Sequence, residues 1–291
     1  MNDTEQLSIC IPAFNEEAGI EQSLAALREA FPLAEIIVVD DGSEDRTAAL
    51  AEKVPGVQLI THERNRGYGA SLKSAMRKAS GQVIAWYDAD GEHRPEDLKK
   101  VIAPVLSGEK DAVIGVRLRH ARHGFPHRYG KWFLKVAAEV IVRDRVPDLN
   151  SGMRCFHKDV IRRYLHLLPD GFSASSTSTL LIMKRGYRLG YQEIDSAPRS
   201  GSSTVRPFRD GWRTLTLLVR MLVLFEAFGF FTLLSLLQIV PGVVYGIWIA
   251  LRNQEGFPIL ASTVIISGLL TFFMGLLGDQ ISELRKERFE D

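Results

Sequence analysis

The chain has 291 residues, and its 36 lysines and arginines nearly balance its 35 aspartates and glutamates, which leaves a formal net charge of +1. This balance provides no general attraction to nucleic acid, so nucleic acid is not an expected partner. The two cysteines, Cys10 and Cys155, have no metal-ligand spacing and predict neither a zinc knuckle nor a disulfide framework. The first residues, MNDTEQLSICIP, contain no basic region followed by a long apolar run, and we expect no signal peptide.

The first 116 residues alternate between short apolar runs and stretches with apolar residues at helical spacing. We expect strands over 7–13, 35–39, 57–61, 82–87 and 111–116, and helices over 17–31, 44–53, 69–80 and 95–107. Ser43 is the expected N-cap of the helix over 44–53. The alternation predicts an α/β fold with a mostly parallel, doubly wound sheet and helices on both faces.

Residues 117–226 have a less regular pattern. We expect helices over 129–142, 158–168 and 177–185, and a strand over 187–194. The stretch 207–226 carries several arginines beside large apolar residues such as Trp212 and Phe225. This mixture predicts an amphipathic helix that lies in a membrane interface.

Two apolar runs without acidic or basic residues follow, over 227–251 and 257–278. Each is longer than the ~20 residues that a helix needs to span ~30 Å of hydrocarbon. The alternative is a pair of buried core helices, but a domain of this size rarely needs helices that are apolar on every face. The short loop between the runs predicts an antiparallel transmembrane hairpin.

The distribution of lysine and arginine predicts the orientation of this hairpin. Basic residues lie on both outer sides of it: Arg206, Arg209, Arg213 and Arg220 before the first run, and Arg285, Lys286 and Arg288 after the second. Only Arg252 lies in the loop between them. Because basic flanks stay on the cytoplasmic side, we expect a protein of the cytoplasmic (inner) membrane with both termini in the cytoplasm. The expected parts are a cytoplasmic domain over 1–206 (halves 1–116 and 117–206), an interface helix over 207–226, the two spans, and a tail over 279–291.

Two carboxylates, Asp88 and Asp90, directly follow the strand expected over 82–87. Mg²⁺ and Mn²⁺ favour such sites, with few protein carboxylates and with substrate phosphates and water as the other ligands. Glu92 is close enough in sequence to be a third ligand. The alternative is a solvated acidic turn, which the position at a strand end disfavours.

Two further polar clusters follow expected strands. Asp40 and Asp41 could accept hydrogen bonds from a ribose hydroxyl or a base, although Asp41 or Ser43 could instead cap the next helix. In the cluster after the first strand, Phe14 could stack on a base and Glu16 could accept from a nucleotide. In a parallel sheet the three clusters meet at one edge, where ligands bind.

Together these segments resemble the inverting family-two glycosyltransferases with the GT-A (Rossmann-like) fold, and within them the polyprenyl-phosphate sugar synthases. The motifs that carry the resemblance are ICIPAFNEE, VVDDGSEDRT, ERNRGYGASLKSAM and DADGEHRPED, in this order. Phe14 stands where the family often has Tyr, and Glu92 where it often has Gln. The segment from Asp148 to Arg154 resembles the acceptor-side motif of the family.

The resemblance implies a role for particular residues. The nucleotide-sugar would be bound by Pro12, Phe14, Glu16, Asp40, Asp41, Ala89, Arg199 and Arg206; the metal, Mg²⁺ or Mn²⁺, by Asp88, Asp90 and Glu92; and the acceptor phosphate by Arg117, Arg128 and Ser151. Asp88, Asp90 and Asp148 are the expected catalytic residues, with Asp148 orienting the acceptor or the sugar. The basic loop that begins at Arg199 is one residue shorter than in the family and lacks its Lys, for which Arg206 is the expected substitute.

The resemblance also implies the reaction, which is inverting transfer of a hexose-type sugar from a UDP- or GDP-sugar to a polyprenyl (undecaprenyl or dolichyl) phosphate. The expected partners are therefore a nucleotide-sugar, a polyprenyl phosphate and membrane lipid, with a homo-oligomer left open. One alternative is another membrane acceptor, such as a glycerolipid or a polysaccharide. The other is a non-catalytic membrane subunit, against which the intact acidic motifs argue.

Overall fold

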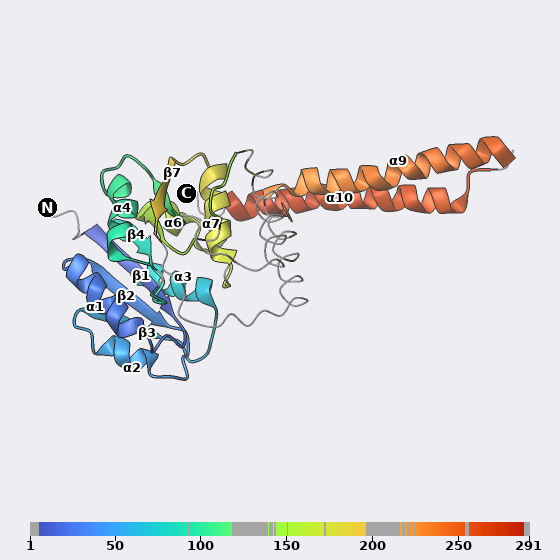
Figure 1. Cartoon of the computed structure of the whole chain (residues 1–291). Coiled ribbons are helices and arrows are strands. Elements are labelled where there is room, and N and C mark those ends of the chain that lie inside the picture. The colour runs from blue at the N-terminus through green and yellow to red at the C-terminus, as the bar shows by residue number, and fades with distance from the viewer. Residues whose placement is uncertain are drawn as a thin grey trace. The chain divides into compact units, whose positions relative to one another are not determined.

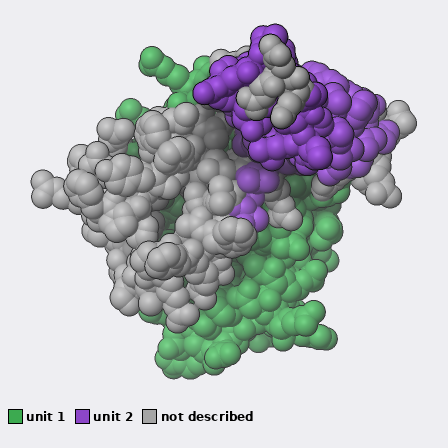
Figure 2. Space-filling model, turned by 90° about the vertical axis from the view of Figure 1, so that its right-hand side faces the viewer, with its two compact units in different colours: residues 1–207 green, residues 208–291 purple. Residues whose placement is uncertain are grey.

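A computed structural model of the chain is shown in Figure 1. It describes residues 6–91, 93–117, 139, 142, 144–149, 151–171, 173–195, 216, 219, 222–223, 225–253 and 256–287. The chain divides into two compact units, residues 1–207 and 208–291 (Figure 2). Of the expected helices, the one over 207–226 and the one over 129–142 lie almost wholly outside the described residues.

A seven-stranded sheet forms the centre of the first unit, with the order β3-β2-β1-β4-β6-β5-β7. Its strands are β1 (Leu7–Ala13), β2 (Glu35–Asp40), β3 (Val57–Thr61), β4 (Val83–Trp86), β5 (Ala112–Arg117), β6 (Arg154–His157) and β7 (Leu189–Ile194). All pairs are parallel except those of β6, which runs antiparallel to β4 and β5. The mostly parallel sheet was predicted, whereas β6 was not, because four residues are too few to show a period.

Helices cover both faces of this sheet, as predicted (Figure 1). They are α1 (Ile20–Ala30), α2 (Thr47–Glu52), α3 (Tyr68–Lys78), α4 (Pro95–Leu106), α6 (Lys158–Arg163) and α7 (Ser173–Lys184). In β1, Ile9 and Ile11 pack with α1 and α4, while Cys10 between them faces the α3 side. Because both faces are buried, the strands read as continuous apolar runs. In β2 and β4 the polar side chains are therefore confined to the strand ends and the loops that follow, where the site lies.

The start of α2 corrects one prediction. Ser43 does not cap this helix, because α2 begins at Thr47. Asp45 instead accepts a hydrogen bond from the Thr47 N–H at 2.9 Å. The hydroxyl of Ser43 is engaged elsewhere: it donates to Asp40 and accepts from the N–H of Asn15. The loop after β2 is thus used for contacts with the loop after β1.

The second unit contains two long helices, α9 (Ala227–Asn253) and α10 (Ile259–Glu287), which pack along each other (Figure 1). Over Ala227–Arg252 and Ile259–Leu284 both are long and apolar enough to cross a membrane, and only 17% of each apolar window is buried. This exposure argues against buried core helices. Glycines allow the close packing, since a Cβ at Gly246 would lie 2.0 Å from the Phe257 ring and one at Gly275 would lie 2.5 Å from Phe231.

Candidate functional site

The loops after β1 and β2 are joined by hydrogen bonds at one edge of the sheet. The N–H of Asn15 donates to Ser43 Oγ at 2.9 Å, and the N–H of Glu44 donates to Asn15 Oδ1 at 2.9 Å. Asn15 has a positive φ of 55°, which its short polar side chain tolerates. Nearby, the N–H of Glu16 donates to Thr47 Oγ1 at 2.8 Å. These bonds fix the backbone that carries Phe14 and Glu16, and the ring of Phe14 remains 42% exposed.

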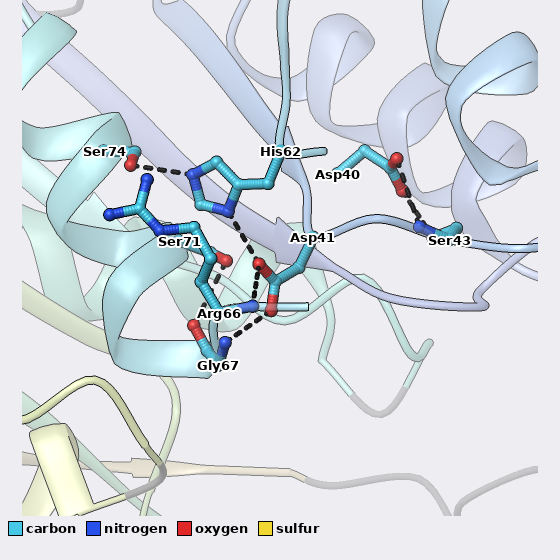
Figure 3. A network of polar contacts seen from close by, with 8 residues as sticks. All are labelled: Asp40, Asp41, Ser43, His62, Arg66, Gly67, Ser71 and Ser74. Atoms are coloured by element: carbon cyan, nitrogen blue, oxygen red, sulfur yellow. Dashed lines mark hydrogen bonds and ion pairs between the residues drawn. The ribbon is translucent and has the colours of Figure 1, made fainter. Parts of the chain in front are cut away.

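Asp40 and Asp41 are both buried, and their side chains have different partners (Figure 3). Asp40 accepts from the N–H and the hydroxyl of Ser43. Asp41 lies 2.6 Å from Nδ1 of His62 and accepts from the N–H groups of Arg66 and Gly67 at 3.0 and 2.7 Å. The idea that Asp41 or Ser43 caps the next helix is therefore wrong. Nucleotide binding by Asp40 and Asp41 stays a prediction.

The pair of Asp41 and His62 holds the loop that precedes α3. His62 Nε2 lies 2.9 Å from Ser74 Oγ on α3, so the histidine ties this helix to the end of β2 (Figure 3). Gly67 has a φ of +102°, and a Cβ there would lie 2.5 Å from the carbonyl oxygen of Asp170. Only glycine fits this position without strain. The arrangement places Tyr68, the first residue of α3, beside the end of β4.

Tyr68, His93 and Gly152 surround the carboxylate of Asp88. The Tyr68 hydroxyl donates to Asp88 Oδ1 at 2.9 Å, and His93 Nε2 lies 3.7 Å from Asp88 Oδ2. A Cβ at Gly152 would fall 1.8 Å from Asp88 Oδ2, so any other residue at this position would displace the carboxylate. Asp88 is therefore held in one orientation by three chain segments.

The same contacts set the protonation of Asp88 and Tyr68. Burial raises the pKa of the Asp88 carboxyl, but the nearby His93, the hydrogen bond from the Tyr68 hydroxyl and the charge of Arg117 outweigh it and bring this pKa below its usual value. Burial, followed by the charge of Asp88, raises the pKa of Tyr68 well above its usual value. At neutral pH Asp88 is thus an anion, and Tyr68 is a neutral hydrogen-bond donor.

Asp90 lies at a pocket of about 330 Å³ between the start of α1 and the loop after β4. The polar residues that line it include Glu16, Gln22, Ser23, Asp90 and His93. Within the described part of the chain, no three His, Cys, Asp or Glu side chains form a metal-binding group. Glu92, the predicted third ligand, lies outside the described residues. Two carboxylates suit a hard divalent cation that takes its other ligands from phosphate and water.

Arg117 and Asp148, predicted from separate segments, form one ion pair. Arg117 donates from Nε to Asp148 Oδ2 at 2.9 Å and from Nη2 to Oδ1 at 3.1 Å. This two-pronged geometry fixes the plane of the guanidinium. Ser151 is fully buried, and its hydroxyl has no hydrogen-bond partner within the described ranges. Arg128, Arg199 and Arg206 lie outside those ranges.

Several residues at the site were not predicted from the sequence, namely Tyr68, His93, Gly152 and Arg154. All four lie inside segments that carry the resemblance, and the one local signal is the pair of glycines that flank Tyr68. A residue between two glycines indicates a position at which two backbone segments come close together. It does not indicate which side chain from another segment will be the partner.

Comparisons with known proteins show the family of the chain. A model of glycosyl transferase family 2 matches residues 8–167, and a model of the GtrB C-terminal hairpin matches residues 229–284. The chain is 29% identical to a dolichyl-phosphate hexose transferase of Haloferax volcanii, over 71% of this chain and 90% of that protein. It is 27% identical to the UDP-N-acetylglucosamine–dolichyl-phosphate N-acetylglucosaminyltransferase of Methanococcus voltae, over 61% of this chain and 79% of that protein.

A solved structure with the same fold is that of glucosyl-3-phosphoglycerate synthase from Mycobacterium tuberculosis, in complex with Mn²⁺, UDP and glucosyl-3-phosphoglycerate. Its TM-score is 0.61 at 20% identity, over 75% of this chain and 78% of that chain. The predicted GT-A fold class is confirmed. The predicted C-terminal pair of apolar helices is confirmed as well.

Proposed function

Because the chain belongs to glycosyl transferase family 2, we propose that it transfers a hexose-type sugar from a UDP- or GDP-sugar to a polyprenyl phosphate, with inversion at the anomeric carbon. Two relatives named as dolichyl-phosphate sugar transferases support this acceptor class. The observation that carries the proposal is the contact between Gly152 and Asp88. It brings the segment with Asp148 and Ser151 against the carboxylate that would serve the nucleotide-sugar.

The donor half of the site would lie at the ends of β1, β2 and β4. Phe14 would stack on the base, while Glu16, Asp40 and Asp41 would bind the nucleoside, with Pro12 and Ala89 lining the site. Asp88, Asp90 and Glu92 would hold Mg²⁺ or Mn²⁺, the ions bound with UDP in the fold relative. When bound, such a cation stabilises the charge of a departing diphosphate by several kcal/mol. Arg199 and Arg206 would bind the same phosphates.

The acceptor half would consist of Arg117, Arg128 and Ser151. A lipid monophosphate carries about 1.5–2 negative charges at neutral pH, by analogy with phosphorylated side chains, and needs no strong base to become a nucleophile. The enzyme must instead bring two anions together and align them. In the structure Asp148 holds the guanidinium of Arg117 in one plane. We therefore assign Asp148 an orienting role.

The proposed reaction takes place at the cytoplasmic face of the membrane, with both termini in the cytoplasm. The support is the basic flanks of α9 and α10, including Arg285 and Lys286 at the end of α10. Reporter fusions after residue 254 and at the C-terminus should report opposite sides of the membrane. If both fusions report the same side, the two-span hairpin is wrong.

The purified full-length protein in lipid vesicles tests the reaction directly. Radiolabelled UDP- and GDP-sugars would be supplied one at a time with undecaprenyl phosphate and Mn²⁺, and the label in the lipid extract would be counted. We expect one donor to label the lipid, with loss of labelling in excess EDTA and recovery on addition of Mg²⁺ or Mn²⁺. Labelling of a glycerolipid in vesicles without polyprenyl phosphate would overturn the acceptor class. Full labelling in excess EDTA would overturn the assignment of a metal cofactor.

A further inference from the structure

Arg154 is a fully buried cation beneath the site. Its guanidinium donates from Nε to the Ser151 carbonyl at 2.7 Å and from Nη2 to the Leu149 carbonyl at 2.9 Å. Nη1 donates to the hydroxyls of Ser178 and Thr179 at 3.2 and 2.6 Å. The side chain thus connects the 149–151 segment to the middle of α7.

This guanidinium has no carboxylate partner within the described ranges. The Trp86 ring lies beside the guanidinium, with its centroid 6.0 Å from the guanidinium carbon. Burial lowers the pKa of Arg154 to about 10, so the group still carries its charge at neutral pH. A buried charge is costly unless its hydrogen bonds are well satisfied. Methionine could provide a similar apolar stem at this position, so packing alone does not account for an arginine.

The hydroxyls that accept hydrogen bonds from Arg154 lie on α7, a helix with an unusual run of buried hydroxyl side chains. In α7, Ser175, Ser176, Thr177, Ser178 and Thr179 are all buried. Buried hydroxyls need hydrogen-bond partners, and two of these have the guanidinium as a partner. Hydrogen bonds to these hydroxyls therefore hold the Arg154 guanidinium against α7.

The segment held by Arg154 is short and touches both halves of the site. Its neighbour Asp148 is bonded to Arg117, and its neighbour Gly152 contacts Asp88. The segment itself carries Ser151, whose buried hydroxyl is unpartnered within the described ranges. Two hydrogen bonds from one planar guanidinium to backbone carbonyls fix the backbone between these contacts more firmly than a single hydrogen bond could.

We propose that Arg154 is a positioning residue that holds the 148–152 segment, and with it Asp148 and Ser151, at a fixed distance from Asp88. This inference rests on the proposed transfer reaction. A displacement of reacting groups by about 1 Å can cost on the order of 10²-fold in rate. The expected loss is in acceptor-dependent transfer, because the donor contacts at β1 and β2 do not involve this segment.

Three variants test the role against a matched control. Arg154→Met removes the charge and all four bonds, Arg154→Lys keeps the charge but not the planar fork, and Thr179→Val removes one acceptor with little change of shape. The control is Arg162→Met, since Arg162 also donates to two backbone carbonyls, those of Met76 and Arg77, away from the site. Each variant would be compared with wild type in transfer rate, KM for polyprenyl phosphate, nucleotide affinity with Mn²⁺ by calorimetry, and hydrogen exchange.

Positioning predicts that Arg154→Met and Arg154→Lys both lose on the order of 10²-fold in kcat/KM for the lipid, while nucleotide affinity changes by less than about threefold. Thr179→Val should lose about tenfold or less. Amides in peptides over 146–153 should exchange faster in both Arg154 variants and not in Arg162→Met. Full activity of Arg154→Lys, or unchanged exchange in this segment, would overturn the inference. Wild-type protein that transfers no sugar to lipid would overturn the proposed function instead, and the exchange measurement would still decide the role of Arg154.

Discussion

Asp40 ends β2 and Asp41 follows it, while Asp88 and Asp90 follow β4, but the structure surrounds the two pairs differently. The first pair is buried, and its carboxylates are bonded to Ser43, to His62 and to backbone N–H groups. In the second pair, Asp88 is oriented by Tyr68, and Asp90 lines a pocket. Similar sequence signals thus mark a pair in which both carboxylates have structural partners and a pair in which one carboxylate, that of Asp90, lines a cavity.

The difference shows what a carboxylate at a strand end can do. Asp41 accepts two backbone N–H groups that begin the turn into α3, and this turn sets the position of Tyr68. Tyr68 in turn orients Asp88. Through this chain of contacts, the pair at the end of β2 supports the orientation of Asp88 in the pair that follows β4, in line with the general need of a reactive group for a rigid surrounding.

Replacement of Asp90, in the pair that follows β4, should have the largest effect on the transfer rate. Asp90→Ala should lower the transfer rate on the order of 10³-fold, equal to about 4 kcal/mol of barrier, because the leaving diphosphate loses its stabilising cation. Its melting temperature should remain near that of wild type, since Asp90 lines a pocket and not the core. Rate measurements together with thermal unfolding check both parts. If a lower melting temperature accounted for the lower rate, Asp90 would be needed for folding, and the contrast between the two pairs would not hold.

Loss of Asp41 should reverse this pattern. Asp41→Ala leaves His62 and two buried N–H groups without their acceptor, which should lower the free energy of unfolding by about 3 kcal/mol. Chemical unfolding of the full-length protein followed by fluorescence measures this. Asp41→Asn, which keeps one carbonyl oxygen, should lose less. An Asp41→Ala protein as stable as wild type would show that the network in Figure 3 is not structural.

Tyr68→Phe tests the link between the pairs. Loss of the hydroxyl removes one hydrogen bond to a charged carboxylate, so we expect about a tenfold lower rate at low Mn²⁺ and a smaller loss at saturating Mn²⁺. Tyr187→Phe is the control, because its hydroxyl pairs with that of Tyr164, at 3.3 Å. A Tyr68→Phe enzyme with the wild-type dependence on Mn²⁺ would mean that Asp88 needs no such support.

Replacement of Glu35, the carboxylate at the opposite end of β2, should have the smallest effect, and this effect should be on stability alone. Burial raises the pKa of Glu35, but hydrogen bonds from Ser8, Ser80 and Gln58 outweigh it and bring the pKa below its usual value. A lowered pKa stabilises the fold above the unfolded pKa, and this contribution is lost as pH falls through the folded value. Glu35→Gln should therefore cost about 1 kcal/mol or less at pH 7, after allowance for solvent, and less than that near pH 3. Urea unfolding at both pH values checks the sign, and a cost that grows on acidification would contradict it.

Much of the fold could be predicted from local pattern. The strands around Ile9, Val38 and Ile84 are buried on both faces and read as apolar runs, and the polar clusters that follow mark the sheet edge. Strand β6 could not be predicted, since it is short and pairs with partners far away in sequence. The same reason hides the bonds of Tyr68 to Asp88 and of Arg117 to Asp148, which only the tertiary arrangement brings together.

The most direct test of the metal assignment is Mn²⁺ binding in the presence of UDP or GDP, measured by the loss of the electron paramagnetic resonance signal of free Mn²⁺. Wild type, Glu35→Gln and Asp90→Ala would be compared at equal concentration of folded protein. We predict that wild type and Glu35→Gln bind one Mn²⁺ with similar affinity and that Asp90→Ala binds at least about tenfold more weakly. Equal binding by Asp90→Ala and wild type would contradict the assignment of the metal to the pair that follows β4.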